Sequence, residues 1–104
     1  MDRQFDRKFD QGKLRHDLVM PEVINELAKV MTYGAEKYSP NSWQLVDDAE
    51  NRYYAALLRH IYAYRLKEKE DPESGINHLS HAMANLQFLL YFQNKGNEDA
   101  PISI

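Results

Sequence analysis

The sequence predicts an all-α fold, a small helical bundle of three main helices that is completed by oligomerisation. Three segments repeat their apolar residues at helical spacing, and no segment shows the alternation that is typical of a strand. A chain of 104 residues has room for one domain, so residues 1–104 are taken as a single unit. Residues 1–19 are expected to form an extended arm and residues 97–104 a loose tail.

The first helix is expected to begin near Pro21, because proline is favoured in a first helical turn, and to end near Tyr38. The cluster Ser39-Pro40-Asn41-Ser42 then breaks the helix. On a helical wheel one side of this helix is apolar, and this side comprises Val23, Ile24, Leu27, Met31, Gly34, Ala35 and Tyr38.

The second helix is expected to run from about Asp48 or Asn51 to Lys69. Two of its faces are distinctive: one is apolar, and the other combines arginine with alanine. The main apolar face comprises Tyr54, Leu57, Leu58, Ile61 and Tyr62, and the other is a stripe of Arg52, Ala56, Arg59 and Ala63. A helix with so little solvated surface is generally covered on more than one side. Three short helices cannot supply that cover, so the sequence predicts a homo-oligomer.

The third helix is expected to begin between Asp71 and Asn77 and to end near Gly96, a plausible C-cap. Its apolar residues suggest one main line of contact with the core. That line comprises Ile76, Leu79, Met83, Leu86 and Leu90.

Composition excludes several classes of protein. The chain has no cysteine, which rules out disulfides and thiolate-bound zinc. Its formal charge of −3 comes without a basic stripe, so polymeric nucleic acid is not an expected partner. No apolar run approaches the roughly 20 residues of a membrane helix, and the charged start lacks the apolar centre of a signal peptide. We therefore expect a cytoplasmic protein that has no membrane partner.

Polar residues interrupt the apolar face at the start of the third helix. His78, His81 and Asn85 are spaced three and four apart, so they share one side of a helix. They are either the polar mouth of a pocket or partly buried groups that pair with their neighbours.

Carboxylates offer a possible site for a hard cation. Asp71 and Glu73 could provide oxygen ligands for Mg²⁺ or Mn²⁺, or they could cap the third helix. Glu22 and Glu26 lie one turn apart on the first helix, and Glu26 is the better additional ligand because it flanks the apolar side.

Basic and aromatic side chains could bind a phosphorylated ligand. The planar guanidinium groups of Arg52 and Arg59 suit phosphate, although they could equally form salt bridges at an interface. Lys13, Arg15 and Lys37 are further phosphate candidates. Four aromatic residues near the loop after the first helix could stack on a base or belong to the core: Tyr33, Tyr38, Trp43 and Tyr53.

Four segments together resemble the dATP/dGTP diphosphohydrolase N-terminal domain family, which is found largely in phages. They are DQGKLRHDLVMPE, ELAKVMTYGAEKYSPNSW, YYAALLRH and DPESGINHLSHAMANLQFLL, and they span about residues 10 to 92. The family is similar to the MazG-like all-α NTP pyrophosphohydrolases. The resemblance implies an oligomeric helical fold, a purine deoxynucleotide substrate and Mg²⁺ or Mn²⁺ on the phosphates. Cleavage would release the monophosphate and pyrophosphate.

On that basis each candidate residue receives a role. The catalytic candidates are His78, His81 and Glu26, and the metal ligands are Asp71, Glu73 and Glu26. The candidates for substrate binding are Lys13, Arg15, Lys37, Tyr38, Trp43, Arg59, His60 and Asn85. Asp10, Asp17 and Ser74 also match the polar pattern of the family. The chain departs from that pattern in two places. Ser42 stands where the family usually has asparagine before the tryptophan, and the family's proline is displaced to Pro21.

The paired acids of the MazG-like group are missing. That group binds magnesium through an ExxE pair and an ExxD pair, whereas Glu22 and Glu26 are four apart and the third helix has no acid beyond Glu73. Two alternatives to an enzyme therefore stay open: a phage sponge that sequesters a nucleotide signal, and a helical interaction module. An HD-type hydrolase is less favoured, because His16-Asp17 precedes Pro21, and a serine hydrolase would need a G-x-S-x-G elbow.

Overall fold

A computed structural model describes residues 11–96. Its main elements are α1 (Pro21–Lys37), α2 (Ala49–Arg65) and α3 (His78–Lys95). Two 3-10 helices, η1 (His16–Leu18) and η2 (Ser42–Leu45), precede α1 and α2. The predicted all-α fold is confirmed. Among the described residues the only β pairing is an isolated bridge between Glu70 and Asn77.

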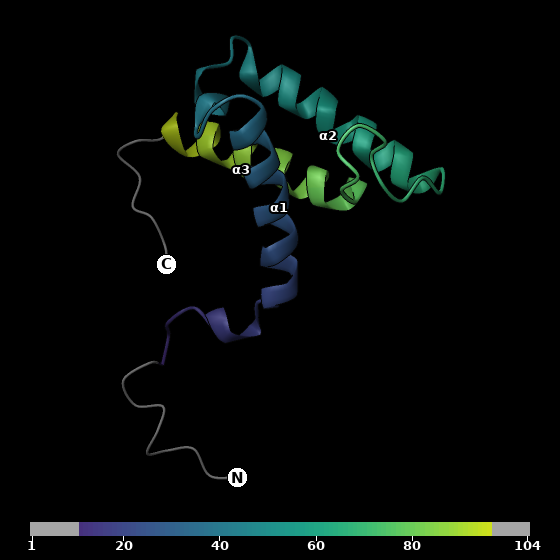
Figure 1. Ribbon diagram of the computed structural model, residues 1–104. Coiled ribbons are helices and arrows are strands. Elements are labelled where there is room, and N and C mark those ends of the chain that lie inside the picture. The colour runs from purple at the N-terminus through teal and green to yellow at the C-terminus, as the bar shows by residue number, and fades with distance from the viewer. Residues whose placement is uncertain (1–10, 97–104) are drawn as a thin grey trace.

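α2 and α3 form an antiparallel hairpin, and α1 crosses one side of α3 (Figure 1). Aromatic contacts hold the hairpin together at its open end. Tyr53 of α2 packs against Phe88 and Phe92 of α3, with ring centroids 4.7 and 6.3 Å apart. The N-terminal half of α1 and the η1 segment project away from the hairpin.

The start of α1 agrees with the prediction, because Pro21 occupies its first turn and Tyr38 is its C-cap. The predicted extended arm is wrong at His16–Leu18, where the chain forms η1. The remainder of that arm before residue 11, and the predicted tail, lie outside the described residues.

The predicted end of the second helix was wrong by four residues, since α2 ends at Arg65 and not at Lys69. Lys67 adopts a left-handed backbone with φ of 74°. The backbone N–H groups of Lys67 and Glu68 donate to the carbonyls of Tyr64 and Ala63. This pair of bonds is a Schellman motif, which usually has glycine at the left-handed position. A lysine at that position gave no signal in the sequence.

The predicted core line of the third helix was also wrong. Leu79, Leu86 and Leu90 are 42%, 48% and 56% exposed, whereas Ala82 and Ala84 are buried. Apolar residues occur on several sides of α3, so the helical wheel could not identify the face that packs. Small residues allow α1 and α2 to approach α3 closely.

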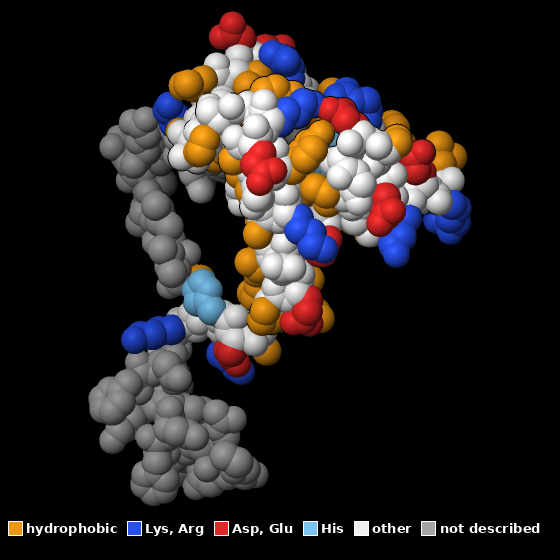
Figure 2. All heavy atoms as spheres, in the orientation of Figure 1, with side chains coloured by type: hydrophobic (Ala, Val, Ile, Leu, Met, Phe, Trp, Pro, Cys, Tyr) orange, Lys and Arg blue, Asp and Glu red, His pale blue; other side chains and the backbone are white. Residues whose placement is uncertain are grey.

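Large apolar side chains are exposed on the other two helices as well. On α1 the predicted apolar side is half exposed at Val23 and Ile24, since that half of the helix projects from the hairpin. Figure 2 shows hydrophobic side chains along this projection. On α2 the exposed side includes Tyr54 and Tyr62. No helix of the described part is long and apolar enough to cross a membrane.

Candidate functional site

A cavity of about 780 Å³ lies where α1, α2, α3 and the two connecting loops meet. The stripe of α2 that carries Arg52, Ala56 and Arg59 faces this cavity. One wall is aromatic, and the opposite end contains polar groups from the loop before α3. The cavity lies within the size range of ligand-binding pockets, about 300 to 1,000 Å³.

The loop from Glu70 to Asn77 positions the polar end. Asp71 Oδ1 accepts the backbone N–H groups of Glu73 and Ser74, at 2.8 and 3.1 Å. Gly75 has a φ of 72°, which favours glycine, and its N–H donates to the carbonyl of Asp71. Asp71 therefore shapes this loop and does not cap α3. The cap is Asn77, whose side chain accepts the N–H of Leu79.

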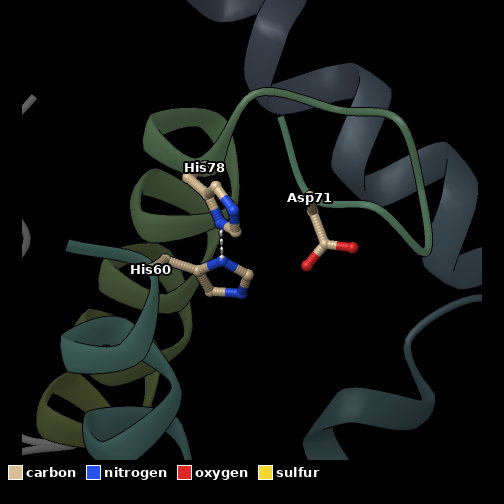
Figure 3. Close-up of side chains that lie close together, drawn as sticks. All are labelled: His60, Asp71 and His78. Atoms are coloured by element: carbon tan, nitrogen blue, oxygen red, sulfur yellow. Dashed lines mark hydrogen bonds between the residues drawn. The ribbon is translucent and has the colours of Figure 1, made fainter. Parts of the chain in front are cut away.

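Histidine side chains connect the two helices of the hairpin behind this loop. The Nδ1 atoms of His60 and His78 lie 2.8 Å apart (Figure 3). Nε2 of His78 lies 2.7 Å from Glu68 Oε1. His78 is only 5% exposed and does not line the cavity, whereas His60 does. Burial, with smaller contributions from the neighbouring histidines, lowers the pKa of His60 to about 4. His60 is therefore neutral at pH 7.

His81 reaches the cavity beside His60. The two imidazole rings stack with centroids 4.6 Å apart and planes 8° apart. Nε2 of His81 lies 2.7 Å from Ser74 Oγ, which also accepts the backbone N–H of Ile76. Burial lowers the pKa of His81, so its imidazole is neutral at pH 7 and one of its ring nitrogens has a lone pair.

Asp71 is ionised at neutral pH. Burial acts to raise the pKa of its carboxyl, but the N–H groups of Ser74 and Glu73 outweigh burial and the net pKa is lowered. Glu73 is ionised too, because its hydrogen bond with Lys37 lowers its pKa and raises that of the lysine. Tyr33 Oη also donates to Glu73. Lys37 thus lines the cavity with its charge already compensated.

Arg59 is the basic group best placed for an anionic ligand. It lines the cavity, and within residues 11–96 no hydrogen bond or ion pair involves its guanidinium group. Arg52 also lines the cavity, with a weak 3.5 Å hydrogen bond to the carbonyl of Asp47. Neither guanidinium forms a salt bridge within residues 11–96, and the interface salt bridge considered for these arginines stays a prediction.

The two aromatic candidates for base stacking differ in their surroundings. Trp43 stacks on Phe88 at 4.6 Å and meets Tyr91 edge-on at 4.9 Å, so it is part of the core. Its Nε1 atom is buried and has no hydrogen-bond partner among the described residues. Tyr38 lines the same cavity but is 71% exposed, with Lys37 above its ring. Tyr38 is therefore the ring with room for a base.

Several predicted site residues lie elsewhere. Glu26 accepts hydrogen bonds from Ser80 Oγ at 2.9 Å and from Lys29, and it faces a separate groove of about 300 Å³. Arg15 pairs with Asp17 beside η1, and neither Arg15 nor Lys13 lines the cavity. Asn85 is buried at the cavity wall, where its amide donates to the carbonyl of His81. Asp10 lies outside the described residues.

The carboxylates expected to share a metal ion are not assembled as a set. Glu26 faces its separate groove, and Glu73 is paired with Lys37 and Tyr33. Within residues 11–96, the potential ligand atoms that do meet belong to His60, Asp71 and His78, all within 4.8 Å of one another. The predicted ligand Asp71 is part of this group. His60 and His78 were predicted to have other roles.

Glu68 is the residue of this region that sequence reasoning missed. Glu68 belongs to the segment that was predicted to be part of the second helix. Its distance along the sequence from His78 does not predict a contact between two separate helices. Only the early end of α2 turns it back towards α3. A helical register therefore gave no signal for the contact between Glu68 and His78.

Comparisons with known proteins agree with the resemblance seen in the sequence. The family model described as "dATP/dGTP diphosphohydrolase, N-terminal" matches residues 3–101. A protein of Salmonella phage PMBT28 named "dATP/dGTP diphosphohydrolase" is 33% identical over 87 residues, which is 84% of this chain and 29% of the relative. The chain thus spans less than a third of the length of that relative. No solved structure matches. The chain belongs to the dATP/dGTP diphosphohydrolase N-terminal family.

Proposed function

We propose that this chain is a metal-dependent purine nucleotide pyrophosphohydrolase that converts dATP or dGTP into the monophosphate and pyrophosphate. The observation that carries the proposal is one cavity that combines an exposed aromatic ring, an arginine without an ion pair among residues 11–96, and a neutral histidine beside an ionised carboxylate. The phage relative is named for the same chemistry, which favours hydrolysis over simple sequestration of a nucleotide.

The cavity offers a distinct region to each part of the nucleotide. The base would stack on Tyr38, the exposed ring at the end of α1. The phosphates would accept hydrogen bonds from Arg59, with Lys37 close by once its ion pair with Glu73 opens. The α-phosphate would then lie toward the polar end, near His81.

In the hydrolysis step a water oxygen attacks the α-phosphorus, and the bond from that phosphorus to the α,β-bridging oxygen breaks. Pyrophosphate leaves with the bonding electrons. We assign the proton of the attacking water to His81, because this imidazole lines the cavity and is neutral. Ser74 orients its ring through the 2.7 Å hydrogen bond. His78, the other predicted base, is buried behind the cavity wall and is not assigned this role.

Asp71 is the carboxylate through which a divalent cation could be held at this end of the cavity. A bound Mg²⁺ or Mn²⁺ ion would offset phosphate charge and polarise the phosphoryl oxygens. Arg59 would supply the remaining positive charge from the other side.

The chain is also proposed to self-associate, in the cytoplasm of a host cell. Self-association is supported by the exposed apolar side chains on α2 and α3, which include Tyr54, Tyr62, Leu86 and Leu90. Size-exclusion chromatography with light scattering checks it, and a purely monomeric protein at micromolar concentration would contradict it.

The proposed reaction is tested by incubating the purified chain with dATP, dGTP or dCTP, with Mn²⁺ or Mg²⁺, and separating the products by anion exchange. The expected products are dAMP or dGMP with an equal amount of pyrophosphate. If no purine monophosphate forms with stoichiometric protein, the proposal is wrong. Intact nucleotide recovered from denatured protein would then indicate a binding protein.

A further inference from the structure

We propose that His60, Asp71 and His78 form a binding site for a first-row transition-metal ion, such as Zn²⁺, that discriminates against Mg²⁺. The site comes from three parts of the fold: the middle of α2, the loop and the first residue of α3 (Figure 3). The inference concerns metal binding alone. It can hold or fail whether or not the chain hydrolyses nucleotides.

The three side chains are close to the spacing that one ion requires. One ligand atom from each residue lies within 4.8 Å of the other two. Bonds from zinc to histidine nitrogen are about 2.0 to 2.1 Å long, so two ligand atoms of one ion can be at most about 4.2 Å apart. The two Nδ1 atoms, at 2.8 Å, are already within that limit. Small rotations of the side chains would bring the Asp71 carboxylate within it.

Glu68 gives His78 the environment of a metal ligand. A histidine that binds metal through one ring nitrogen generally donates the N–H of the other nitrogen to a carboxylate or carbonyl group. Nε2 of His78 lies 2.7 Å from Glu68 Oε1. With the proton held on Nε2, the Nδ1 atom of His78 presents a lone pair toward His60.

Asp71 supplies the anionic ligand. It is ionised at neutral pH, and its Oδ1 atom is fixed by the backbone of the loop. A carboxylate has a second oxygen, which remains able to bind a cation. The site therefore combines two imidazoles with one carboxylate, and the Glu68 carboxylate lies beside it.

This donor set determines which ions fit. Mg²⁺ requires oxygen ligands in near-octahedral geometry and keeps several of its waters. Imidazole nitrogen suits zinc, iron, nickel and copper, and two histidines with one carboxylate are a common set for transition metals. The oxygen ligands that Mg²⁺ would need, from Glu26 and Glu73, are engaged elsewhere.

The test is equilibrium dialysis of the metal-free full chain, without nucleotide, against Mn²⁺, Zn²⁺, Co²⁺ or Mg²⁺, with the d–d absorption of bound Co²⁺ as a second readout. We expect one transition-metal ion per chain and at least about tenfold weaker binding of Mg²⁺. His78→Gln should abolish this binding. Glu68→Gln should weaken it about 10- to 100-fold, as is usual for the partner of a ligating histidine.

His16→Gln is the matched control, because His16 lies in η1 and outside this group. It should bind metal like the unmodified chain. Equal metal binding by His78→Gln and His16→Gln would overturn the proposal, as would tighter binding of Mg²⁺. If His78→Gln does not fold, as judged by circular dichroism, Glu68→Gln decides, since the Glu68 side chain is 56% exposed.

Hydrolysis assays in Mg²⁺ separate this inference from the proposed function. Absence of transition-metal binding by the unmodified chain, with hydrolysis in Mg²⁺ retained, would refute only the metal inference. Metal binding without monophosphate production from any purine nucleotide would refute only the proposed reaction.

Discussion

Nδ1 of His60 on α2 and Nδ1 of His78 on α3 lie 2.8 Å apart, so two imidazoles meet at the loop end of the helical hairpin. The unfolded chain protonates a histidine near its ordinary pKa of about 6.5. Burial lowers the pKa of His60 in the folded chain to about 4. As the pH falls between these values, the unfolded state takes up the proton first, so the folded state loses stability.

We therefore expect the urea midpoint of the metal-free chain to fall between pH 7 and pH 4.5, measured with EDTA present. His60→Gln should flatten this dependence, whereas His16→Gln should retain it. Equal slopes for the unmodified chain and His60→Gln would contradict the assignment.

Arg59 is expected to contribute to nucleotide binding through charge-assisted hydrogen bonds to phosphate. Bonds of this kind contribute about 1.5 to 3 kcal/mol, so Arg59→Gln should weaken dATP binding about 10- to 100-fold. Isothermal titration with a non-hydrolysable dATP analogue measures the effect. Arg65→Gln is the control, since Arg65 is an exposed arginine of the same helix that does not line the cavity. Similar losses in both variants would show that only net charge matters.

Tyr38 and Trp43 should respond differently to substitution by alanine. Stacking of a base on an aromatic ring contributes about 1 to 3 kcal/mol, so Tyr38→Ala should weaken nucleotide binding about 5- to 100-fold with little change in stability. Trp43→Ala should cost about 3 kcal/mol of unfolding free energy, because Trp43 packs on Phe88. Titration and urea denaturation of both variants check the two roles. The assignment fails if Tyr38→Ala binds normally.

Ser80→Ala tests whether Glu26 has a structural role, as its contact with Ser80 suggests. The buried Ser80 hydroxyl donates to Glu26 across the contact between α3 and α1. Its removal should cost about 1 kcal/mol of unfolding free energy and leave the rate of hydrolysis unchanged. Glu26→Gln should likewise retain its hydrolysis rate at saturating metal. If Glu26→Gln loses hydrolysis while staying folded, Glu26 has the catalytic or metal role that the sequence suggested.

The sequence predicted the helices well because their signals are local. Pro21 marks the start of α1, and Ser39-Pro40 follows its end. Apolar residues at helical spacing define all three helices. The sequence did not predict features that depend on long-range contacts or on an unusual backbone conformation. Lys67 ends α2 in a conformation that usually needs glycine, and this end brings Glu68 to His78. The packing face of α3 was wrongly predicted because apolar residues occur on several sides of this helix.

The site was predicted in part for the same reason. His60, His81 and Arg59 on the helices and Asp71 in the loop before α3 line one cavity. The grouping of Glu26 with Asp71 depended on how α1 crosses α3, which no spacing along the chain encodes. The ion pair between Lys37 and Glu73 depends on the path of the loop before α3, which the sequence did not predict.

The bridge between Glu70 and Asn77 closes the loop before α3, and this closure has a practical consequence for protein engineering. Residues 68–81 include Glu68, Asp71, Ser74, His78 and His81 in one continuous stretch. Of the three proposed metal ligands, His60 alone lies outside this stretch. Such a stretch could be transplanted as a cassette onto another antiparallel helical hairpin. One histidine facing it from the neighbouring helix would complete the constellation.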